Sequence, residues 1–491
     1  MSNVEFTLTG SLYERVTGDL KLIVDRAFGI QEYLDDNGNN MVIEKRADHT
    51  LVGFGLLRSL AERGFITVHE DSREVDVDRV NEIFSDFCKL DPSLSIRDYQ
   101  PRCVIKALNR KRGMISAAPG AGKTEMISAL VTYIRGKILV SNNRSKILSQ
   151  LKARFIKRGI PANEIALFGE KGWHTKRVII GGTTAINNRI KKQDPETIKF
   201  LGELEALIFD EAHHAGAATW VTIAANCQPD YLLHFTGTPW EKPKDPLSNP
   251  GDAHLWGITG GVIIHISSVF LRKKGYLAHP LVHFLDYENT EGWLRSFDWK
   301  KVERKYIVNA YGRLDRMCLL LEILNHFQVK TLVIVSMIDH GYNIMSALRA
   351  LDVNVSFSMG GGKVAYIDPL SGHVESRPCT ETFDKEYFRD NNILIGSSIY
   401  DEGTDIPVLE CGVMAGGGKG VRRSIQRIGR VIRAKPDPDK NFGFWFDFND
   451  VFNNITKRHS EERRSIYEDE SYQIYDSFDE LLAMIKYVKG I

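Results

Sequence analysis

The segment Ala117–Thr124, with the sequence AAPGAGKT, constrains the fold of this chain more than any other. It follows a short apolar run at 113–117, which predicts a buried strand, and precedes a stretch at 125–135 whose apolar residues have helical spacing. Gly120 and Gly122 allow backbone N–H groups to face a phosphate group at the positive end of that helix. This context predicts a phosphate-binding loop within an α/β fold, although the segment begins with alanine where the strict pattern has glycine.

Polar side chains in and after this loop have the chemistry of a nucleoside-triphosphate site. We expect Lys123 to reach the terminal phosphates and the Thr124 hydroxyl to bind Mg²⁺. Further along the chain, a second apolar strand at 204–209 ends in Asp210 and Glu211. Asp210 can hold Mg²⁺ through water, and Glu211 can orient or deprotonate the attacking water. The loop residues expected to contact ATP are Pro119, Gly120, Ala121, Gly122, Lys123 and Thr124.

Several short motifs, taken in their order along the chain, carry a family resemblance. The order resembles that of superfamily 2 DExH-box DNA helicases and translocases of the XPB, UvsW and RecG type. The resemblance implies an α/β fold with two tandem RecA-like parallel-sheet motor domains, and ATP and Mg²⁺ as cofactors. The matching segments are Leu94–Gln100 before the loop, Ala117–Thr124 (motif I), Asp210–His213 (motif II), Thr236–Pro239 (motif III), Gly396–Pro407 (motif V) and Gln426–Arg433 (motif VI).

The same resemblance implies roles for residues in both halves of the chain. Arg97 and Gln100 would contact adenine. Arg430 and Arg433 would be arginine fingers, which stabilise the charge that develops on the transferred phosphate. The alternative is that the arginines of this segment form a solvated basic helix face. The other implied residues are Gln426, which contacts nucleotide or water, Arg427, which pairs with the acidic motif, and Gly403 and Asp405 of motif V, which belong to the nucleotide site.

Other segments resemble the nucleic-acid-binding motifs of this family. Hydroxyl groups and backbone N–H groups at helix starts suit sugar–phosphate contacts, which position a strand without reading its bases. The chain has Ser-Asn where motif Ia of the family opens with Pro-Thr. The expected contacts are Ser141, Asn142, Thr183, Thr184, Ser397 and Ser398.

The chain divides into an accessory domain, two motor domains and their connections. Residues 1–90 hold 10 Lys and Arg against 17 Asp and Glu, a net charge of −7, and predict a small acidic α/β accessory domain. This domain can bind DNA, or it can pack on the motor or bind a partner. The other predicted segments are motor domain 1 at 91–270, an inter-lobe linker at 271–306, motor domain 2 at 307–455 and a C-terminal helical segment at 456–491.

The overall composition limits the other function classes. The formal net charge is +1, so binding to nucleic acid must be local. The chain has no run of about 18 apolar residues and no basic-then-apolar start, so we expect a cytoplasmic protein without a membrane partner. If the chain is viral, the cytoplasm is that of the host cell. We also expect the protein to be monomeric. The six cysteines are scattered without a C-x-x-C pair, which argues against a zinc site.

Together these features predict an ATP-dependent DNA helicase or translocase. The expected partner is forked, branched or single-stranded DNA in replication, recombination or repair, because Asp210–His213 differs from the Asp-Glu-Ala-Asp of RNA-directed relatives. Two alternatives remain open. One is an RNA-dependent ATPase or helicase, whose chemistry is identical, and the other is a non-unwinding motor subunit that moves duplex DNA for a partner.

Overall fold

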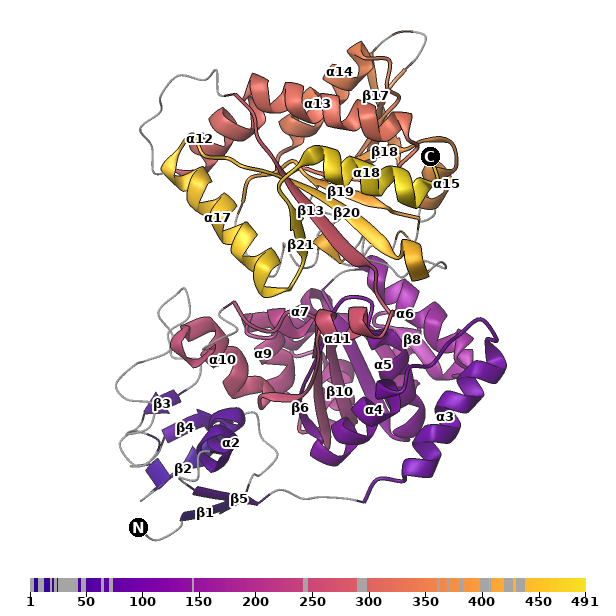
Figure 1. Ribbon diagram of the computed structural model, residues 1–491. Coiled ribbons are helices and arrows are strands. Elements are labelled where there is room, and N and C mark those ends of the chain that lie inside the picture. Colours follow the sequence, from indigo (N-terminus) through magenta and orange to yellow (C-terminus); the bar gives the residue numbers. More distant parts are fainter. Residues whose placement is uncertain are drawn as a thin grey trace. The chain divides into compact units, whose positions relative to one another are not determined.

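The computed structural model divides the chain into two compact units, residues 1–267 and 268–491, which are described here separately (Figure 1). The structure describes residues 4–7, 13–17, 20–21, 24, 43–45, 50–62, 66–69, 74–143, 145–241, 246–288, 298–359, 363–368, 371, 373–379, 383–397, 406, 408–418, 427–429 and 438–491. None of the helices within these residues is long and apolar enough to cross a membrane.

The first unit is built on a seven-stranded sheet in which every strand pairing is parallel. The strand order is β12-β6-β11-β10-β7-β9-β8. Because all strands run the same way, the loops that follow them meet at one edge of the sheet. The strands are β6 (Arg112–Ala117), β7 (Lys137–Asn142), β8 (Ile165–Leu167), β9 (Val178–Gly182), β10 (Leu204–Asp210), β11 (Tyr231–Thr236) and β12 (Val262–Ile266).

Helices cover this sheet and bury its apolar side chains. All six residues of β6 are buried, as expected for a strand in a sheet covered on both faces. The α-helices are α3 (Val77–Leu90), α4 (Tyr99–Arg110), α5 (Lys123–Tyr133), α6 (Ser145–Lys157), α7 (Thr183–Lys191), α8 (Pro195–Gly202), α9 (Ala218–Ala225) and α10 (Pro250–Thr259). Short 3₁₀ helices lie at Ala162–Glu164, Trp173–Thr175, Ala212–His214 and Pro246–Ser248.

The N-terminal part of this unit forms small sheets of its own around α2 (Phe54–Glu62). The helix packs on α10, and the buried Arg58 donates to the backbone carbonyl groups of Arg110 and Arg112. Those carbonyl groups lie at the start of β6, whereas the phosphate loop follows its end. The strands are β1 (Val4–Thr7) paired with β5 (Ile66–His69), and β2 (Tyr13–Val16) and β3 (Ile43–Lys45), which both pair with β4 (Thr50–Gly53).

The second unit contains a nine-stranded sheet in the order β17-β16-β15-β18-β14-β19-β20-β13-β21. Its pairings are parallel except for those of β16 with β15 and with β17. The strands are β13 (His279–Leu285), β14 (Thr331–Ile334), β15 (Ser356–Met359), β16 (Lys363–Ile367), β17 (Val374–Pro378), β18 (Ile393–Gly396), β19 (Cys411–Met414), β20 (Phe442–Phe448) and β21 (Gln473–Tyr475).

The helices of the second unit pack on its sheet (Figure 1). Buried side chains of α13, α14 and α18 form one apolar core with the strands. The α-helices are α11 (Ser268–Lys273), α12 (Trp299–Glu303), α13 (Tyr311–His326), α14 (Ile338–Ala350), α15 (Phe383–Asp390), α17 (Asn454–Asp469) and α18 (Phe478–Lys489). A π-helical turn lies at Arg304–Val308, and a 3₁₀ helix lies at Pro438–Lys440.

Two segments that were predicted as a linker and as helical each contain a strand of this sheet. The range 271–306, expected to be a linker, contains β13, which pairs with β20 along seven residues and also with β21. The range 456–491, expected to be helical, contains β21 itself. The sequence of β13, HPLVHFL, interrupts its apolar residues with two histidines and a proline, and this obscures the strand pattern.

Candidate ATP site and nucleic-acid contacts

The phosphate loop connects β6 to α5 and has the backbone conformation that its glycines permit. Gly120 and Gly122 adopt φ values of 79° and 80°, in the left-handed region, and Gly122 is the N-cap of α5. A Cβ atom at Gly122 would lie 2.2 Å from Nε2 of Gln100. Lys123 begins the helix, and its Nζ donates to the Ala117 carbonyl at 3.3 Å. The loop therefore places a lysine and a helix N-terminus together, as a phosphate chain requires.

The segment before α4 packs directly against this loop. Arg97 donates to the Gly120 carbonyl, and Gln100 Nε2 donates to the Ala121 carbonyl at 3.2 Å. The Tyr99 hydroxyl donates to the same Ala121 oxygen at 2.7 Å, a contact that the sequence analysis missed. Arg97 and Gln100 thus hold the loop backbone, and their contact with adenine stays a prediction.

The acidic pair lies at the end of β10. Burial, and next the charge of Glu211, raise the pKa of the Asp210 carboxyl to about 6, while Lys123 opposes the shift. The Glu211 N–H donates to Asp210 Oδ1 at 3.0 Å. Glu211 itself has φ 55°, a left-handed conformation that a residue with a side chain adopts at a cost of about 1–3 kcal/mol. The backbone therefore turns sharply just where the second carboxylate is presented.

Motif III is tied to both the acidic motif and the loop. His213 Nδ1 lies 3.0 Å from Thr236 Oγ1 in a hydrogen bond, and 3.6 Å from Glu211 Oε2. A Cβ atom at Gly237 would lie 3.0 Å from Pro119 Cδ, so the backbone after β11 passes close to the phosphate loop. Motifs I, II and III therefore meet at the edge of the sheet where β6, β10 and β11 end.

The expected nucleic-acid contacts of the first unit stay predictions, and three of the four side chains are buried. Ser141 is fully buried and its Oγ donates to the Gly181 carbonyl at 3.0 Å. Asn142 is also fully buried, and its amide donates to Asp210. Thr183 is 2% exposed. These three side chains are used inside the unit because they lie on strand ends and at a helix start that pack against neighbours, so they are poorly placed to contact a strand. Thr184 is exposed in the first turn of α7 and stays a candidate.

The predicted site residues of the second unit are only partly described. Ser397 follows β18 and is buried, and its N–H donates to the Ser358 carbonyl at 3.1 Å. Arg427 is buried with Nη1 3.0 Å from Met414 Sδ, and its pairing with the acidic motif stays a prediction. The predicted residues that lie outside the described part of the chain are Ser398, Gly403, Asp405, Gln426, Arg430 and Arg433.

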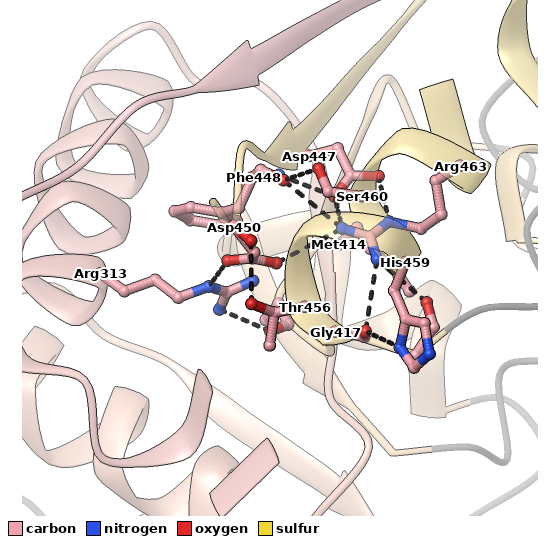
Figure 2. A network of polar contacts seen from close by, with 12 residues as sticks. Arg313, Met414, Gly417, Asp447, Phe448, Asp450, Thr456, His459, Ser460 and Arg463 are labelled. Carbon is pink, nitrogen blue, oxygen red and sulfur yellow. Dashed lines mark hydrogen bonds and ion pairs between the residues drawn. The ribbon is translucent and has the colours of Figure 1, made fainter. Parts of the chain in front are cut away.

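A buried polar network supports the backbone just after β19, at residues 415–418 (Figure 2). Arg463 of α17 makes a bidentate pair with Asp447, at 2.8 and 2.9 Å, and lies 3.4 Å from Asp450. Arg313 of α13 donates to the other oxygen of Asp450 at 3.0 Å. The side chains of both arginines are fully buried. The structure thus buries two guanidinium groups, each paired with a carboxylate, which is the condition for such charges to be tolerated.

The same guanidinium groups hold the backbone of the glycine run 416–418. Arg463 Nη1 donates to the carbonyls of Gly417 and Gly418 at 3.3 and 3.0 Å, and Arg313 Nη1 donates to the Ala415 carbonyl at 2.6 Å. Although three consecutive glycines restrict the backbone little, these hydrogen bonds hold this run in place. Sequence reasoning missed this network because its members are far apart in the chain, and the only local signal is two aspartates at the end of an apolar strand.

Comparisons with known proteins agree with this arrangement. The family model "Type III restriction enzyme, res subunit" matches residues 93–241, and "Helicase conserved C-terminal domain" matches residues 313–435. The chain is 24% identical over 368 residues to the DNA 3'-5' translocase XPB2 of Sulfurisphaera tokodaii, covering 70% of this chain and 79% of that protein. It is 24% identical over 400 residues to a putative DNA 3'-5' helicase Rad25 of Haloarcula marismortui, covering 77% and 56%.

A solved structure shows the same fold across both units. S. cerevisiae Dbp5 bound to RNA and ADP BeF3 aligns with a TM-score of 0.55 at 14% identity, covering 84% of this chain and 99% of that one. The fold and the site thus define an ATP-hydrolysing helicase enzyme with two tandem RecA-like domains. Residues 93–241 and 313–435 thus match helicase-related family models, and the chain is similar to superfamily 2 DNA helicases and translocases of the XPB type.

Proposed function

We propose that the protein uses ATP with Mg²⁺ to move along forked or branched DNA in replication, recombination or repair. The observation that carries the proposal is the meeting of motifs I, II and III at one sheet edge. There the Glu211 N–H donates to Asp210, His213 lies 3.6 Å from Glu211, and the charge of Lys123 acts on the Asp210 carboxyl. The names of the two relatives, a DNA translocase and a putative DNA helicase, support DNA as the substrate.

The residues of the site fit a nucleotide with its cation. The loop offers backbone N–H groups and Lys123 to phosphate oxygens, and Thr124 and Asp210 offer the hard oxygen ligands that Mg²⁺ prefers. When bound, Mg²⁺ adds positive charge where phosphate oxygens gain negative charge. Glu211 orients the attacking water or accepts its proton. From the resemblance of motif VI, we also propose that Arg430 and Arg433 stabilise the transferred phosphate, a contribution of about 10³–10⁵ in rate for such arginines.

The phosphate loop is hydrogen-bonded to β12, the last strand of the first unit. The Ala118 N–H donates to the Ile266 carbonyl at 3.0 Å, and the first unit ends at Ser267. On the other side, Arg272 of α11 donates to the Glu470 carbonyl and lies over the Tyr472 ring at 4.9 Å. We propose that a conformational change on nucleotide binding turns ATP turnover into movement along DNA.

Stimulation of ATP hydrolysis by different nucleic acids tests the choice of substrate. We expect forked DNA to raise the turnover rate more than RNA of the same length and sequence, with single-stranded DNA between them. The measurement is steady-state ATP hydrolysis at saturating concentrations of each polymer, at one fixed salt concentration because phosphate contacts weaken as salt increases. Equal or greater stimulation by RNA would reject DNA as the preferred substrate.

A motor that moves duplex DNA without unwinding it is the second candidate. The match of residues 93–241 to the restriction-enzyme family model favours it, because that description names the res subunit of a restriction enzyme. Such a motor would be stimulated most by plain duplex and would displace a triplex-forming third strand without separating a fork. The proposed helicase would separate the fork, so one assay of each kind distinguishes the two.

The raised pKa of Asp210 predicts how Mg²⁺ demand depends on pH. Because the carboxyl has a pKa of about 6, a proton competes with Mg²⁺ for it as the pH falls through that value. From this pKa the ionised fraction at pH 7.5 is about fourfold that at pH 5.5, so the Mg²⁺ concentration for half-maximal hydrolysis should be about fourfold higher at the lower pH. The same shift makes the folded state less stable as the pH rises from the ordinary value of 3.8 to about 6, because the folded state binds the proton more tightly.

This Mg²⁺ dependence is measured by titrating Mg²⁺ at fixed ATP at both pH values. The control is the Asp210→Asn variant, since an amide takes up no proton in this range. Because this variant should hydrolyse little ATP, the comparison with it measures Mg²⁺-dependent binding of a non-hydrolysable ATP analogue to both proteins at both pH values. A half-saturation concentration that is the same at pH 5.5 and 7.5 in the wild type would contradict the assignment of Asp210 as the competing group.

A further inference from the structure

Asn142 occupies the end of β7, beside the acidic motif on β10. The strands are parallel neighbours, with Ser141 opposite Phe209, so the next residue on each strand is Asn142 and Asp210. The Asn142 Nδ2 amide donates to Asp210 Oδ2 at 3.2 Å, and the Asn142 side chain is fully buried. The sequence analysis placed this residue on the nucleic-acid surface, whereas the structure places it against the ATP site.

Each oxygen of the Asp210 carboxylate has its own donor. Oδ1 accepts from the Glu211 N–H at 3.0 Å, and Oδ2 accepts from Asn142. Two donors on different oxygens, one from the backbone and one from a neighbouring strand, fix the plane of the carboxylate. The remaining lone pairs are then presented in a set direction.

The chemical type of this donor suits a site that also holds a cation. A carboxamide donates a hydrogen bond without carrying charge, so it orients Asp210 without neutralising it. A lysine or arginine at this position would pair with the carboxylate and compete with a bound Mg²⁺. A group that donates a hydrogen bond to a metal ligand keeps that ligand in its productive direction. Losing such a donor costs about 10–100-fold in metal affinity or activity.

Ser141 provides an internal comparison on the same strand. It is as fully buried as Asn142, but its Oγ donates to the Gly181 carbonyl on β9. The two adjacent residues therefore make polar contacts with different neighbouring strands. If a loss of Mg²⁺ binding came from a general disturbance of β7, changing either residue would cause it. If it came from the hydrogen bond to Asp210, only changing Asn142 would cause it.

We propose that Asn142 is a positioning residue of the ATP site, which directs the Asp210 carboxylate towards the cation that accompanies the nucleotide. The inference rests on the proposed role of Asp210 in binding Mg²⁺. It assigns to the segment resembling motif Ia a role inside the nucleotide site, through a side chain where the family motif has threonine.

The test compares Asn142→Leu and Asn142→Ser with Ser141→Ala. Leucine keeps the branched shape, is larger and lacks the donor. Serine is smaller and keeps a polar group that is too short to reach Asp210. If one variant fails to fold, the other still tests the inference. For each protein we would measure equilibrium binding of a fluorescent non-hydrolysable ATP analogue, with Mg²⁺ and with EDTA instead. Steady-state kcat and the Mg²⁺ concentration for half-maximal hydrolysis complete the set.

Both Asn142 variants should bind the analogue in EDTA within about twofold of the wild type and lose most of the gain in affinity that Mg²⁺ provides. Their kcat should fall by about 10–100-fold, the range for a lost hydrogen-bond donor to a metal ligand. Ser141→Ala should resemble the wild type in all three measurements. An Asn142 variant with native thermal unfolding and a full Mg²⁺ gain would overturn the inference, as would an equal loss in Ser141→Ala.

The outcome separates this inference from the proposed function. An Asp210→Asn variant that retains the full Mg²⁺ gain and wild-type turnover would remove Asp210 from the cation site, and the proposed function would fail first. Loss of the gain in Asp210→Asn together with its retention in both Asn142 variants would leave the proposed function intact and reject Asn142 alone.

Discussion

Replacing Lys123 with alanine is expected to lower kcat for ATP hydrolysis by at least about 10²–10³-fold, the cost of removing one preorganised electrostatic group from a transition state. Lys123 is the first residue of α5, and its Nζ donates to the Ala117 carbonyl at 3.3 Å. Alanine is the best helix former and the position is partly exposed, so the fold should be retained. The loss should therefore be catalytic.

The measurement is ATP turnover at saturating ATP, with circular dichroism and thermal unfolding on the same samples. Lys171→Ala is the matched control, because Lys171 is an exposed lysine of the same unit in a turn outside the site. The control should hydrolyse ATP at the wild-type rate. Wild-type turnover in Lys123→Ala would refute the assignment of the phosphate loop.

Replacing Arg463 with alanine should destabilise the second unit by about 3–5 kcal/mol, the cost of breaking a buried ion pair by removing one partner. The Arg463 side chain is 0% exposed and pairs with Asp447, whose side chain is also 0% exposed. Without the guanidinium group, Asp447 would keep a buried charge with one cationic partner fewer. The carbonyls of Gly417 and Gly418 would also lose their donor.

Chemical denaturation, with Arg458→Ala as the control, checks this value. Arg458 lies on the same helix, but its side chain is 61% exposed and its ion pair with Glu462 spans 3.7 Å, so alanine there should change stability by less than about 0.5 kcal/mol. If Arg463→Ala proved as stable as Arg458→Ala, the network of Figure 2 would not stabilise this unit.

Local patterns in the sequence predicted the elements that position the site. The phosphate loop was predicted because its glycines, its lysine and the flanking strand and helix are adjacent in the chain, and the structure has β6 and α5 on either side of it. The strand ending in Asp210 was predicted for the same reason, from a run at 204–209 that is apolar except for Glu205. Spacing of this kind carries information because short loops leave few alternatives for the backbone.

Contacts between distant segments could not be predicted in this way. The direction of the Asn142 side chain depends on the pairing of β7 with β10, which no local spacing specifies. The same is true of β13, which joins the second sheet through strands more than 150 residues further along the chain, and of Arg313 and Arg463, which meet across Asp450. These contacts could not be predicted because the residues that make them are far apart in the sequence.

The central claim is that one ATP site, built from motifs I and II, drives movement on DNA. The most direct test is the rate of ATP hydrolysis by the wild-type protein, measured with and without forked DNA in the same preparation, beside the fraction of forks separated. The account predicts Mg²⁺-dependent hydrolysis that rises on adding the fork, and fork separation that requires hydrolysis. Hydrolysis that is absent in Mg²⁺, or that is unchanged by any DNA, would contradict it.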